Sequence, residues 1–401
     1  MNVGLLYSAL RGFNALDGGI ASHFAELAAG LATAGAHVRV YVVAGQTPPS
    51  VIQTASGYEI VSLSAQMPRW LHQATGRPWQ LHSLTGAWFR SRAAARLVLA
   101  DHATRPLDIV ETSSSGLLAL HLSRAHRRPP LITRVSTTSE QLVAHNSAPA
   151  SRLSCLENSL ERRLVVHSDI ILTHTRHHRD AFCATWHLDP ARVALVPHGI
   201  ALPPAEALSP TPPVDAPLTL LYVGRFEHRK GIDTLLGALP AVLARHPRAR
   251  AILAGHDPAD GWQTRFWRAH PTLDRRRVIF PGRIDAATLA SLYRTADLFV
   301  APSRYESFGL IYVEAMAWAK PVVACRAGGI PEVVADGETG LLIPPGDTAE
   351  LVRHLDTLLA DSALRLRLGR AGRSRAQRLF SREAMAVASL ALYGSAIRHA
   401  R

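Results

Sequence analysis

Two glutamates, Glu306 and Glu314, lie in and after a polar turn, with seven residues between them. The apolar run 297–301 before the turn is short enough for a buried strand, and apolar residues recur at helical spacing over 308–319. The start of a helix offers free backbone N–H groups and a positive dipole end to a phosphate. Carboxylates accept hydrogen bonds from sugar hydroxyls. The pattern therefore fits a nucleotide sugar, although two solvated glutamates would look the same.

A second group lies in the loop after the expected strand 218–223. Arg225 and Lys230 stand five positions apart in this loop, and Lys230 is one of only two lysines in the chain, the other being Lys320. Two cations in one loop can hold a diphosphate and stabilise it as it leaves. On its own the pair fits solvated loop charges equally well, so its meaning depends on the elements around it.

The elements that carry these loops form two similar halves. Residues 201–217 contain six prolines, which predicts a linker between a domain over 1–200 and a domain over 218–380. Strands and helices alternate in both halves, so we expect two doubly wound α/β domains with ligands bound at a central cleft, beside the carboxyl ends of the strands. The last helix, 381–401, is expected to pack back on the first domain.

The first half opens with an expected strand, Val3–Leu10, and then Gly18 and Gly19 precede an amphipathic helix. Two glycines at a strand-to-helix junction let the backbone approach a ligand closely, and they equally fit an ordinary tight turn. The segment lacks the G-x-G-x-x-G pattern, which disfavours a nicotinamide dinucleotide fold.

Composition limits the classes of function. The 401 residues are 47% apolar with a net charge of +13, which suits an anionic donor, acidic lipid or nucleic acid. Nucleic acid is the weakest option because the arginines are spread along the chain without a recognition motif. Three scattered cysteines without metal-ligand spacing fit a reducing compartment. No apolar run approaches the roughly 20 residues of a membrane span, and the N-terminus reads as a strand rather than a signal peptide, so we expect a cytoplasmic protein.

Residues 66–92 are unusual because Trp70, Trp79 and Trp88 alternate with arginines and histidines. A basic, aromatic segment can meet an acceptor or dock on the inner face of an anionic membrane. It can equally be a helical insertion that packs its aromatic side chains inward.

Nearly the whole chain resembles the retaining glycosyltransferases of family 4, which have the GT-B architecture of two Rossmann-like domains. The resemblance is strongest over residues 218–346, where three motifs follow in the family's order and spacing. The matching motifs are G-R-x-x-x-x-K-G at 224–231, the glutamate pair with S-F-G at 306–314, G-G-x-P-E at 328–332, and, in the first half, G-G-x-x-x-H at 18–23 and P-H-G-I at 197–200.

The resemblance implies a role for each matching residue. Arg225 and Lys230 would contact the donor diphosphate. Glu314 would accept hydrogen bonds from the ribose, and Glu306 would hold the transferred sugar and the distal phosphate. The other implied donor contacts are Gly18 and Gly19 near the phosphate, the backbone of Ser307, Phe308, Gly309 and Leu310, Gly255 at the nucleotide, and Arg283 and Ile284 at the base.

The first domain departs from the family at one position. Many members have a histidine near the sugar after the fourth strand, where this chain reads Glu111-Thr112-Ser113-Ser114. Glu111 is a candidate substitute for that histidine, and the departure leaves the identity of the donor sugar open.

The resemblance also implies the reaction: transfer of a sugar, with retention, from a UDP or GDP sugar to an acceptor hydroxyl, in polysaccharide or glycolipid biosynthesis. The leaving phosphate takes the acceptor's proton, so neither metal nor cofactor is required. The acceptor, expected at the first domain, is left open as a saccharide, a lipid-linked molecule or a small molecule. The alternatives are a nucleotide-sugar epimerase or phosphorylase of the same architecture and a non-catalytic binding protein.

Overall fold

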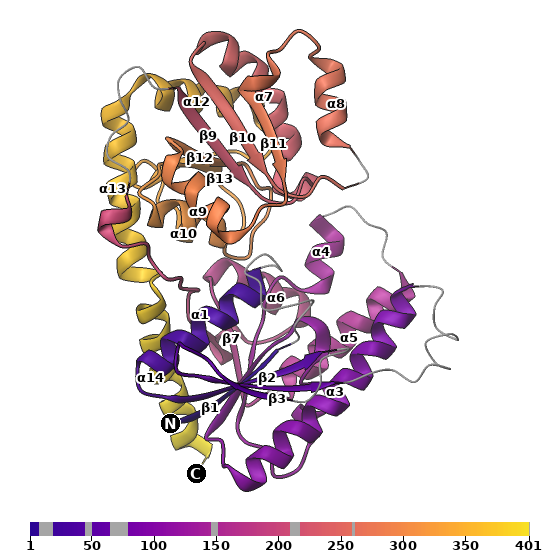
Figure 1. The fold of residues 1–401 in the computed structure, drawn as a ribbon. Helices are drawn as coiled ribbons and strands as arrows, with labels where there is room; N and C mark the ends of the chain where they lie inside the picture. The colour runs from indigo at the N-terminus through magenta and orange to yellow at the C-terminus, as the bar shows by residue number, and fades with distance from the viewer. Residues whose placement is uncertain are drawn as a thin grey trace. The chain divides into compact units, whose positions relative to one another are not determined.

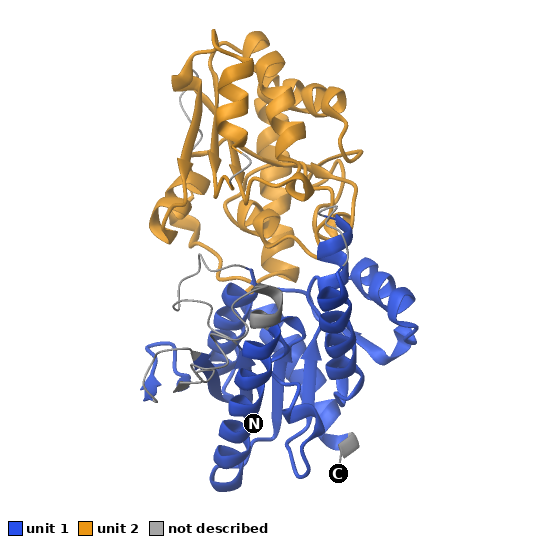
Figure 2. Cartoon of the chain, turned by 90° about the vertical axis from the view of Figure 1, so that its right-hand side faces the viewer, with its two compact units in different colours: residues 1–199, 382–401 blue, residues 200–381 orange. Residues whose placement is uncertain are grey.

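The computed structural model describes residues 1–7, 19–44, 50–64, 79–145, 151–208, 217–258 and 261–400. The chain forms two compact units, residues 1–199 with 382–401 and residues 200–381 (Figures 1 and 2). Each unit contains one largely parallel sheet covered by helices, which confirms the predicted α/β class. Ile200, the last residue of the expected first domain, and Leu202, from the expected linker, both pack against the core of unit 2. Residues 209–216 lie outside the described residues.

Unit 1 contains an eight-stranded sheet that is parallel except for the antiparallel pair β3 and β4. Successive residues of β1 point to opposite faces, so Leu5 joins the core on one side and Leu6 the core on the other. The order of strands reverses between β1 and β5. In sheet order the strands are β3 (Ser50–Gln53), β4 (Glu59–Ser64), β2 (His37–Ala44), β1 (Asn2–Tyr7), β5 (Ile109–Ser113), β6 (Leu131–Arg134), β7 (Ile170–Thr173) and β8 (Val193–Leu195).

Helices cover both faces of this sheet. The C-terminal helix α14 packs beside α1, as predicted: Arg382 of α14 donates to Glu26 of α1 at 2.6 Å, and Tyr393 joins the same core as Phe24. The helices described in unit 1 are α1 (Gly19–Thr33), α3 (Trp79–Thr104), α4 (Ser139–His145), α5 (Arg152–Val166), α6 (Arg176–Trp186) and α14 (Arg382–Ala400), with short 3-10 turns at Ser115–Leu117, Leu122–Arg124 and Pro190–Arg192.

Unit 2 contains a six-stranded sheet that is parallel throughout. All four residues of β12 and of β13 are buried, as expected for strands covered on both faces. The order of strands reverses between β9 and β12. In sheet order the strands are β11 (Val278–Gly282), β10 (Ala249–Ala254), β9 (Leu218–Val223), β12 (Leu298–Ala301), β13 (Val322–Cys325) and β14 (Gly340–Ile343).

The helices of unit 2 enclose one continuous core. They include α8, which we did not predict although Trp262 and Phe266 stand four positions apart and both pack against this core. The helices described in this unit are α7 (Ile232–Arg245), α8 (Trp262–Ala269), α9 (Ala286–Thr295), α10 (Leu310–Ala317), α11 (Ile330–Val333), α12 (Thr348–Ala360) and α13 (Ser362–Leu379), with 3-10 turns at Ala205–Ala207, His228–Lys230 and Arg275–Arg277.

The sequence after residues 112–116 predicts a helix that ends at about Ala125, and this helix is absent from unit 1. The segment from Gly116 to Ala125 forms two separate 3-10 turns, and both Gly116 and Leu117 have positive φ angles, which breaks helical continuity. The apolar residues here are buried all round rather than along one helical face. Among the described residues, no helix has the length and apolar character needed to cross a bilayer.

Candidate functional site

The candidate site lies where the strand order of unit 2 reverses. Strands β9 and β12 are neighbours in the sheet but not in sequence, and ligands of doubly wound folds bind beside the carboxyl ends of such strands. The loop after β9 carries Arg225 and Lys230, and the loop after β12 carries Glu306. The topology therefore brings together the two loops singled out in the sequence.

The two loops are joined by an ion pair between Lys230 and Glu306. The Lys230 Nζ donates to Glu306 Oε1, which also accepts from the Ser303 hydroxyl at 3.2 Å. The Lys230 side chain is 16% exposed and that of Glu306 is 9% exposed. The ion pair and the Ser303 hydrogen bond hold Glu306 in position, and both side chains of the pair keep a small exposed fraction through which they can meet a ligand.

The electrostatics of the pair keep Glu306 ionised. Burial acts to raise the pKa of the Glu306 carboxyl, but Lys230 and then Arg229 outweigh burial, and the pKa is lowered overall. Burial lowers the pKa of Lys230, and the Glu306 carboxylate opposes that shift. The Glu306 carboxylate is therefore kept ionised by the neighbouring Lys230 and Arg229.

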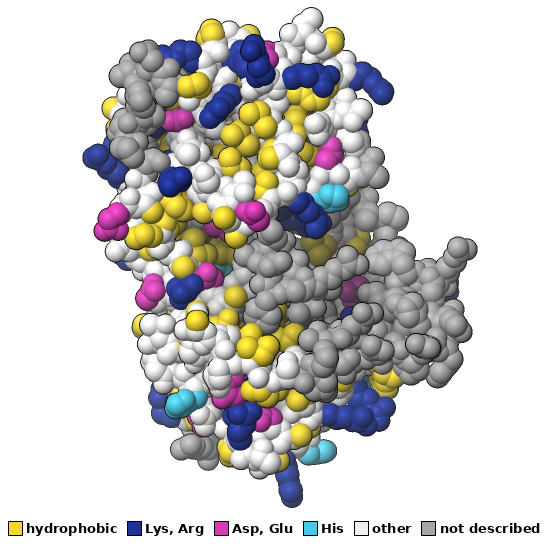
Figure 3. All heavy atoms as spheres, viewed as in Figure 1, with side chains coloured by type: hydrophobic (Ala, Val, Ile, Leu, Met, Phe, Trp, Pro, Cys, Tyr) yellow, Lys and Arg dark blue, Asp and Glu magenta, His cyan; other side chains and the backbone are white. Residues whose placement is uncertain are grey.

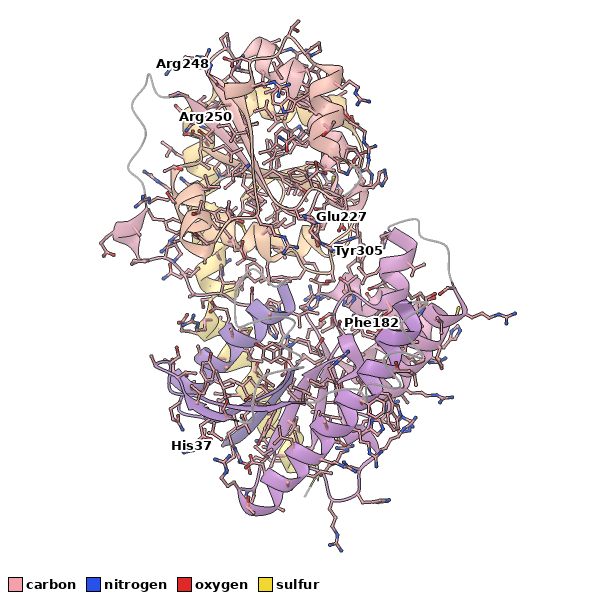
Figure 4. The ribbon with its side chains drawn as sticks, turned by 45° about the vertical axis from the view of Figure 1, so that its right-hand side comes forward. His37, Phe182, Glu227, Arg248, Arg250 and Tyr305 are labelled. Carbon is pink, nitrogen blue, oxygen red and sulfur yellow. The ribbon has the colours of Figure 1, made fainter. Side chains whose placement is uncertain are left out.

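Arg229 is a third cation that the sequence analysis did not select. Its side chain is 4% exposed, its Nη2 donates to Glu227 at 2.7 Å, and its Nη1 donates to the Tyr305 carbonyl at 3.1 Å. Nη1 also lies 3.6 Å from Glu306 Oε2. Glu227 and Tyr305, which Arg229 connects, are labelled in Figure 4. Arg229 thus fixes the two loops from beneath, and the only sequence signal for it was its position beside Lys230.

Arg225 is the exposed cation of the same loop. Its side chain is 60% exposed, and Nη2 lies 3.3 Å from Glu227 Oε1. A carboxylate at this distance steadies the guanidinium without burying it. Arg225 is therefore placed to contact a ligand in solution, whereas the buried Arg229 is placed to hold the loops.

The N-terminus of α10 adjoins Glu306 and carries no side-chain cap. Its N-cap is Gly309, in the left-handed conformation with φ 95°. The backbone N–H groups of the first turn of a helix lack intrahelical partners and attract anions. Ser307 and Leu310 are partly exposed here, whereas the Phe308 ring is buried and stacks edge-on against Phe380. Because the Phe308 ring is buried, a ligand contact of this residue would be made by its backbone.

Glu314 lies one turn further along α10. Its Oε2 accepts from the hydroxyl of Tyr293 at 2.8 Å, and the side chain is partly exposed. Tyr293 lies on α9 and was not predicted, because nothing in the sequence links it to Glu314. The hydrogen bond holds the Glu314 carboxylate in a defined orientation, and the predicted ribose contact stays a prediction.

Gly328 explains why a G-G-x-P-E turn accompanies the glutamate. A Cβ at Gly328 would lie 2.4 Å from the backbone oxygen of Glu306, and the residue has φ 56°. The N–H of Gly329 donates to the same oxygen at 2.8 Å. This turn therefore holds the backbone of Glu306 in place from behind.

Three of the remaining predicted donor contacts, Gly255, Arg283 and Ile284, follow neighbouring strands of unit 2 at the same edge of its sheet. Gly255 follows β10, and a Cβ there would lie 1.8 Å from the Gly224 oxygen, so the loops after β9 and β10 touch. Arg283, exposed, and Ile284, partly exposed, follow β11. Gly19 is the exposed first residue of α1 in unit 1, and Gly18 lies outside the described residues.

Glu111 is a correction to the sequence analysis. Its side chain is 0% exposed, Oε1 accepts from Arg134 Nε at 2.8 Å, and Oε2 accepts from the Tyr393 hydroxyl at 2.5 Å. A carboxylate with both oxygens bonded inside the core is held there by its partners. Glu111 therefore ties the sheet of unit 1 to α14 and does not face a sugar.

Four buried histidines, His23, His174, His178 and His198, form a cluster that begins beside Glu111, whose Oε1 lies 4.0 Å from His23 Nε2. The Nδ1 atoms of His198 and His23 are 2.7 Å apart, and the rings of His174 and His198 are 4.3 Å apart. His178 Nδ1 lies 2.7 Å from the Thr173 hydroxyl. Burial is the largest cause that lowers the pKa of each histidine: to about 3 for His178 and well below the usual range for the other three. The cluster is therefore neutral at physiological pH.

The segment 66–92 is only partly described, and Trp70 lies outside the described residues. Trp79 begins α3, and Trp88, in the same helix, has a side chain that is 43% exposed. The helical part of the prediction is confirmed, while the inward packing of the aromatic rings fails for Trp88. Over the described ranges, no three His, Cys, Asp or Glu side chains gather in a way that could hold a metal ion.

Two family models together span most of the chain. "Glycosyltransferase Family 4" matches residues 17–202, and "Glycosyl transferases group 1" matches residues 207–375. The chain is similar to a glycogen synthase of Mycobacterium tuberculosis, with 31% identity over 96% of this chain and 92% of the relative. It is also similar to a D-inositol 3-phosphate glycosyltransferase of Kineococcus radiotolerans, with 31% identity over 95% and 91%.

The fold has equally extensive matches among solved structures. A sucrose-phosphate synthase from Thermosynechococcus elongatus superposes with a TM-score of 0.75 and 26% identity, covering 99% of both chains. The fold of Anabaena HepE, solved with UDP and glucose, matches with a TM-score of 0.71 and 19% identity over 98% of this chain and 99% of that one.

Proposed function

This chain belongs to the glycosyltransferases of family 4, which share the GT-B architecture, and we propose that it transfers a hexose from a UDP or GDP sugar to an acceptor hydroxyl with retention of configuration. The observation that carries the proposal is the pairing of Lys230 with Glu306 beside the uncapped N-terminus of α10. Cation, carboxylate and free N–H groups match a diphosphate that bears a sugar.

The proposed reaction needs no nucleophile from the protein. The bond between the anomeric carbon and the diphosphate oxygen breaks, and the acceptor oxygen bonds to the same face of that carbon. The leaving phosphate takes the proton of the acceptor hydroxyl. Arg225, Lys230 and the N-terminus of α10 stabilise the negative charge that develops on the diphosphate, and they act in a fixed geometry. Independence from metals and cofactors is part of this proposal.

The ion pair gives Lys230 and Glu306 defined tasks in donor binding. Without a donor, each neutralises the other inside a largely buried site. A bound diphosphate offers Lys230 a second anionic partner, and Glu306 Oε1 is then released toward the sugar hydroxyls. The carboxylate remains compensated during this exchange because Arg229 stays 3.6 Å from Oε2.

The acceptor is proposed more broadly. The names of the relatives state different products or acceptors, namely glycogen, an inositol phosphate and sucrose phosphate. We therefore propose a saccharide, a lipid-linked molecule or a small metabolite, in cytoplasmic synthesis of a polysaccharide or glycolipid. The departure at Glu111 gives no further guidance, since that side chain is buried.

A thermal-shift series with UDP, GDP, ADP and their sugars tests the donor. A nucleotide at a hundred times its Kd stabilises the fold by about 2.7 kcal/mol, and Glu306→Gln should reduce the shift given by the nucleotide sugar. Arg245→Gln is the matched control, because it disrupts an ion pair with Asp356 outside the site. Product NMR then reports the anomeric configuration. Absence of both shift and transfer with every nucleotide sugar would refute the proposal, and product without an acceptor would indicate an epimerase.

A further inference from the structure

One part of unit 1 contributes strongly to the net charge of +13, because its arginines far outnumber its acidic residues. Between residues 60 and 139 the sequence contains ten arginines and only three acidic residues. All three acids are held by other partners: Asp101 by Arg39 and Arg105, Asp108 by the backbone N–H of Asn2, and Glu111 by Arg134. Elsewhere, on the face drawn in Figure 3, cationic side chains are scattered over the surface.

Two of these arginines, Arg92 and Arg96, are exposed on the outer side of α3. Trp88, Arg92 and Arg96 are exposed at intervals of four residues, which places them in one row along the helix. The opposite side of α3 is anchored, since Ala94, Ala95 and Val98 belong to a buried core. The row is therefore fixed in orientation, facing away from the sheet (α3 in Figure 1).

A 3-10 turn adds to this row. His121 lies against Trp88 with their ring centroids 5.1 Å apart, and the backbone N–H of His121 donates to the Ser91 hydroxyl at 2.9 Å. Burial, and then Arg92 and Arg124, lower the pKa of His121. Arg124 ends the 3-10 turn Leu122–Arg124 that follows His121, and it is exposed. We call Trp88, Arg92, Arg96, His121 and Arg124 the α3 face.

The α3 face combines an exposed indole with nearby cations. Arg92 lies over the Trp88 ring, 5.7 Å from its centroid. The helical row from Trp88 to Arg96 spans about 12 Å, comparable with the Debye length of about 10 Å in 0.1 M salt. Its charges therefore act together on a partner.

We propose that the α3 face docks this enzyme peripherally on a bilayer containing anionic lipids. Arginines meet the phosphates of the headgroups, and an indole lies in the headgroup layer with its ring toward the acyl chains. A nucleic acid would satisfy the charges, but this row has one exposed aromatic ring and no series of rings on which bases could stack. The proposal specifies a partner beyond the transfer reaction and does not depend on which nucleotide sugar is used.

Sedimentation of the full chain with vesicles tests the proposal. The wild type should bind vesicles of equal parts phosphatidylcholine and phosphatidylglycerol and not vesicles of phosphatidylcholine alone. Each arginine near an anionic surface contributes about fivefold to binding, so R92Q/R96Q/R124Q should weaken binding about a hundredfold. Trp88→Ala should give a smaller loss that low salt does not restore.

The matched control is R268Q/R370Q/R378Q, three exposed arginines of unit 2 that carry the same total charge. Equal losses in the two triple variants would overturn the proposal, because net charge alone would then explain binding. It would also be overturned if the wild type failed to bind anionic vesicles, or if it bound single-stranded DNA through these arginines in preference to lipid. Nucleotide-induced thermal shifts report the donor site separately, so failure of either proposal is distinguishable from failure of the other.

Discussion

Replacing Lys230 with methionine removes the charge at the centre of the site while keeping most of the side-chain volume. Lys230 and Glu306 are 16% and 9% exposed, so the substitution leaves a largely buried carboxylate without its closest cation. Breaking such a pair typically destabilises a protein by about 3–5 kcal/mol. Because Arg229 remains 3.6 Å away and Ser303 still donates at 3.2 Å, we expect a loss of about 3 kcal/mol.

The effect on catalysis has a different origin. If Lys230 stabilises charge on the leaving diphosphate, its loss should lower kcat by about 10²–10³, or about 2.7–4 kcal/mol. Adding Glu306→Gln to Lys230→Met separates the two effects. The double variant no longer buries an unpaired charge, so most of the stability should return while turnover stays low. Urea unfolding and initial transfer rates measure the two quantities.

The pH dependence provides a second check on the same pair. The folded-state pKa of Glu306 is depressed, so its ionisation stabilises the fold above the unfolded-state pKa of about 4.3. That contribution is lost as pH falls through the folded-state pKa. The stability deficit of Lys230→Met should therefore be largest near neutral pH and should narrow below about pH 4.3. Wild-type turnover in Lys230→Met, or joint recovery of stability and turnover in the double variant, would refute the assigned role.

Three further outcomes follow from the structure. In urea unfolding, Tyr393→Phe should destabilise unit 1 by about 1–3 kcal/mol, and Glu111→Gln, which leaves the buried Arg134 without its carboxylate, by about 3–5 kcal/mol. Donor KM should be unchanged in both, and a raised KM would return Glu111 to the sugar site. The four buried histidines have depressed folded-state pKa values, so the free energy of unfolding should fall as pH drops below about 6.5, by about 1.4 kcal/mol per pH unit for each histidine. In pH-dependent unfolding, His198→Asn should make this slope shallower. An unchanged slope would contradict the role of the cluster. Gly328→Ala should lower kcat/KM about a hundredfold by shifting Glu306, and wild-type kinetics would show that the turn has no positioning role.

The bounds of helices and strands could be predicted where residues that end such elements flank an apolar segment. The sequence predicts strands over 218–223 and 249–254 and helices over 348–360 and 362–379, and β9, β10, α12 and α13 have these bounds. Prolines, glycines or capping aspartates flank apolar residues of one period in these segments. It failed at 116–125, where apolar residues on every side gave no period to distinguish a helix from successive turns. Buried segments of this kind follow the surrounding tertiary structure rather than local preference.

The partners of several site residues could not be predicted either, because they lie far away in the sequence. Glu111 was a candidate ligand because it stands where many family members have a histidine, yet it lies within β5 and its partner Tyr393 is 282 positions away. Tyr293 and Glu314 are likewise 21 positions apart and share no motif. A polar side chain at a strand end has the same sequence signature whether it binds a ligand or closes a core, and only its partners distinguish the two.

The same principle explains why the three motifs of unit 2 occur together. Lys230 pairs with the Glu306 side chain, whereas Gly328 and Gly329 touch its backbone. A site built for transition-state charge must be fixed before the substrate arrives, because reorientation during the reaction would consume the stabilisation it provides. Many of the motif residues that indicate sugar transfer are therefore residues that keep the Glu306 carboxylate in a fixed position. It follows that residues without ligand contact, such as Gly328 and Arg229, belong to the function as fully as those expected to touch the donor.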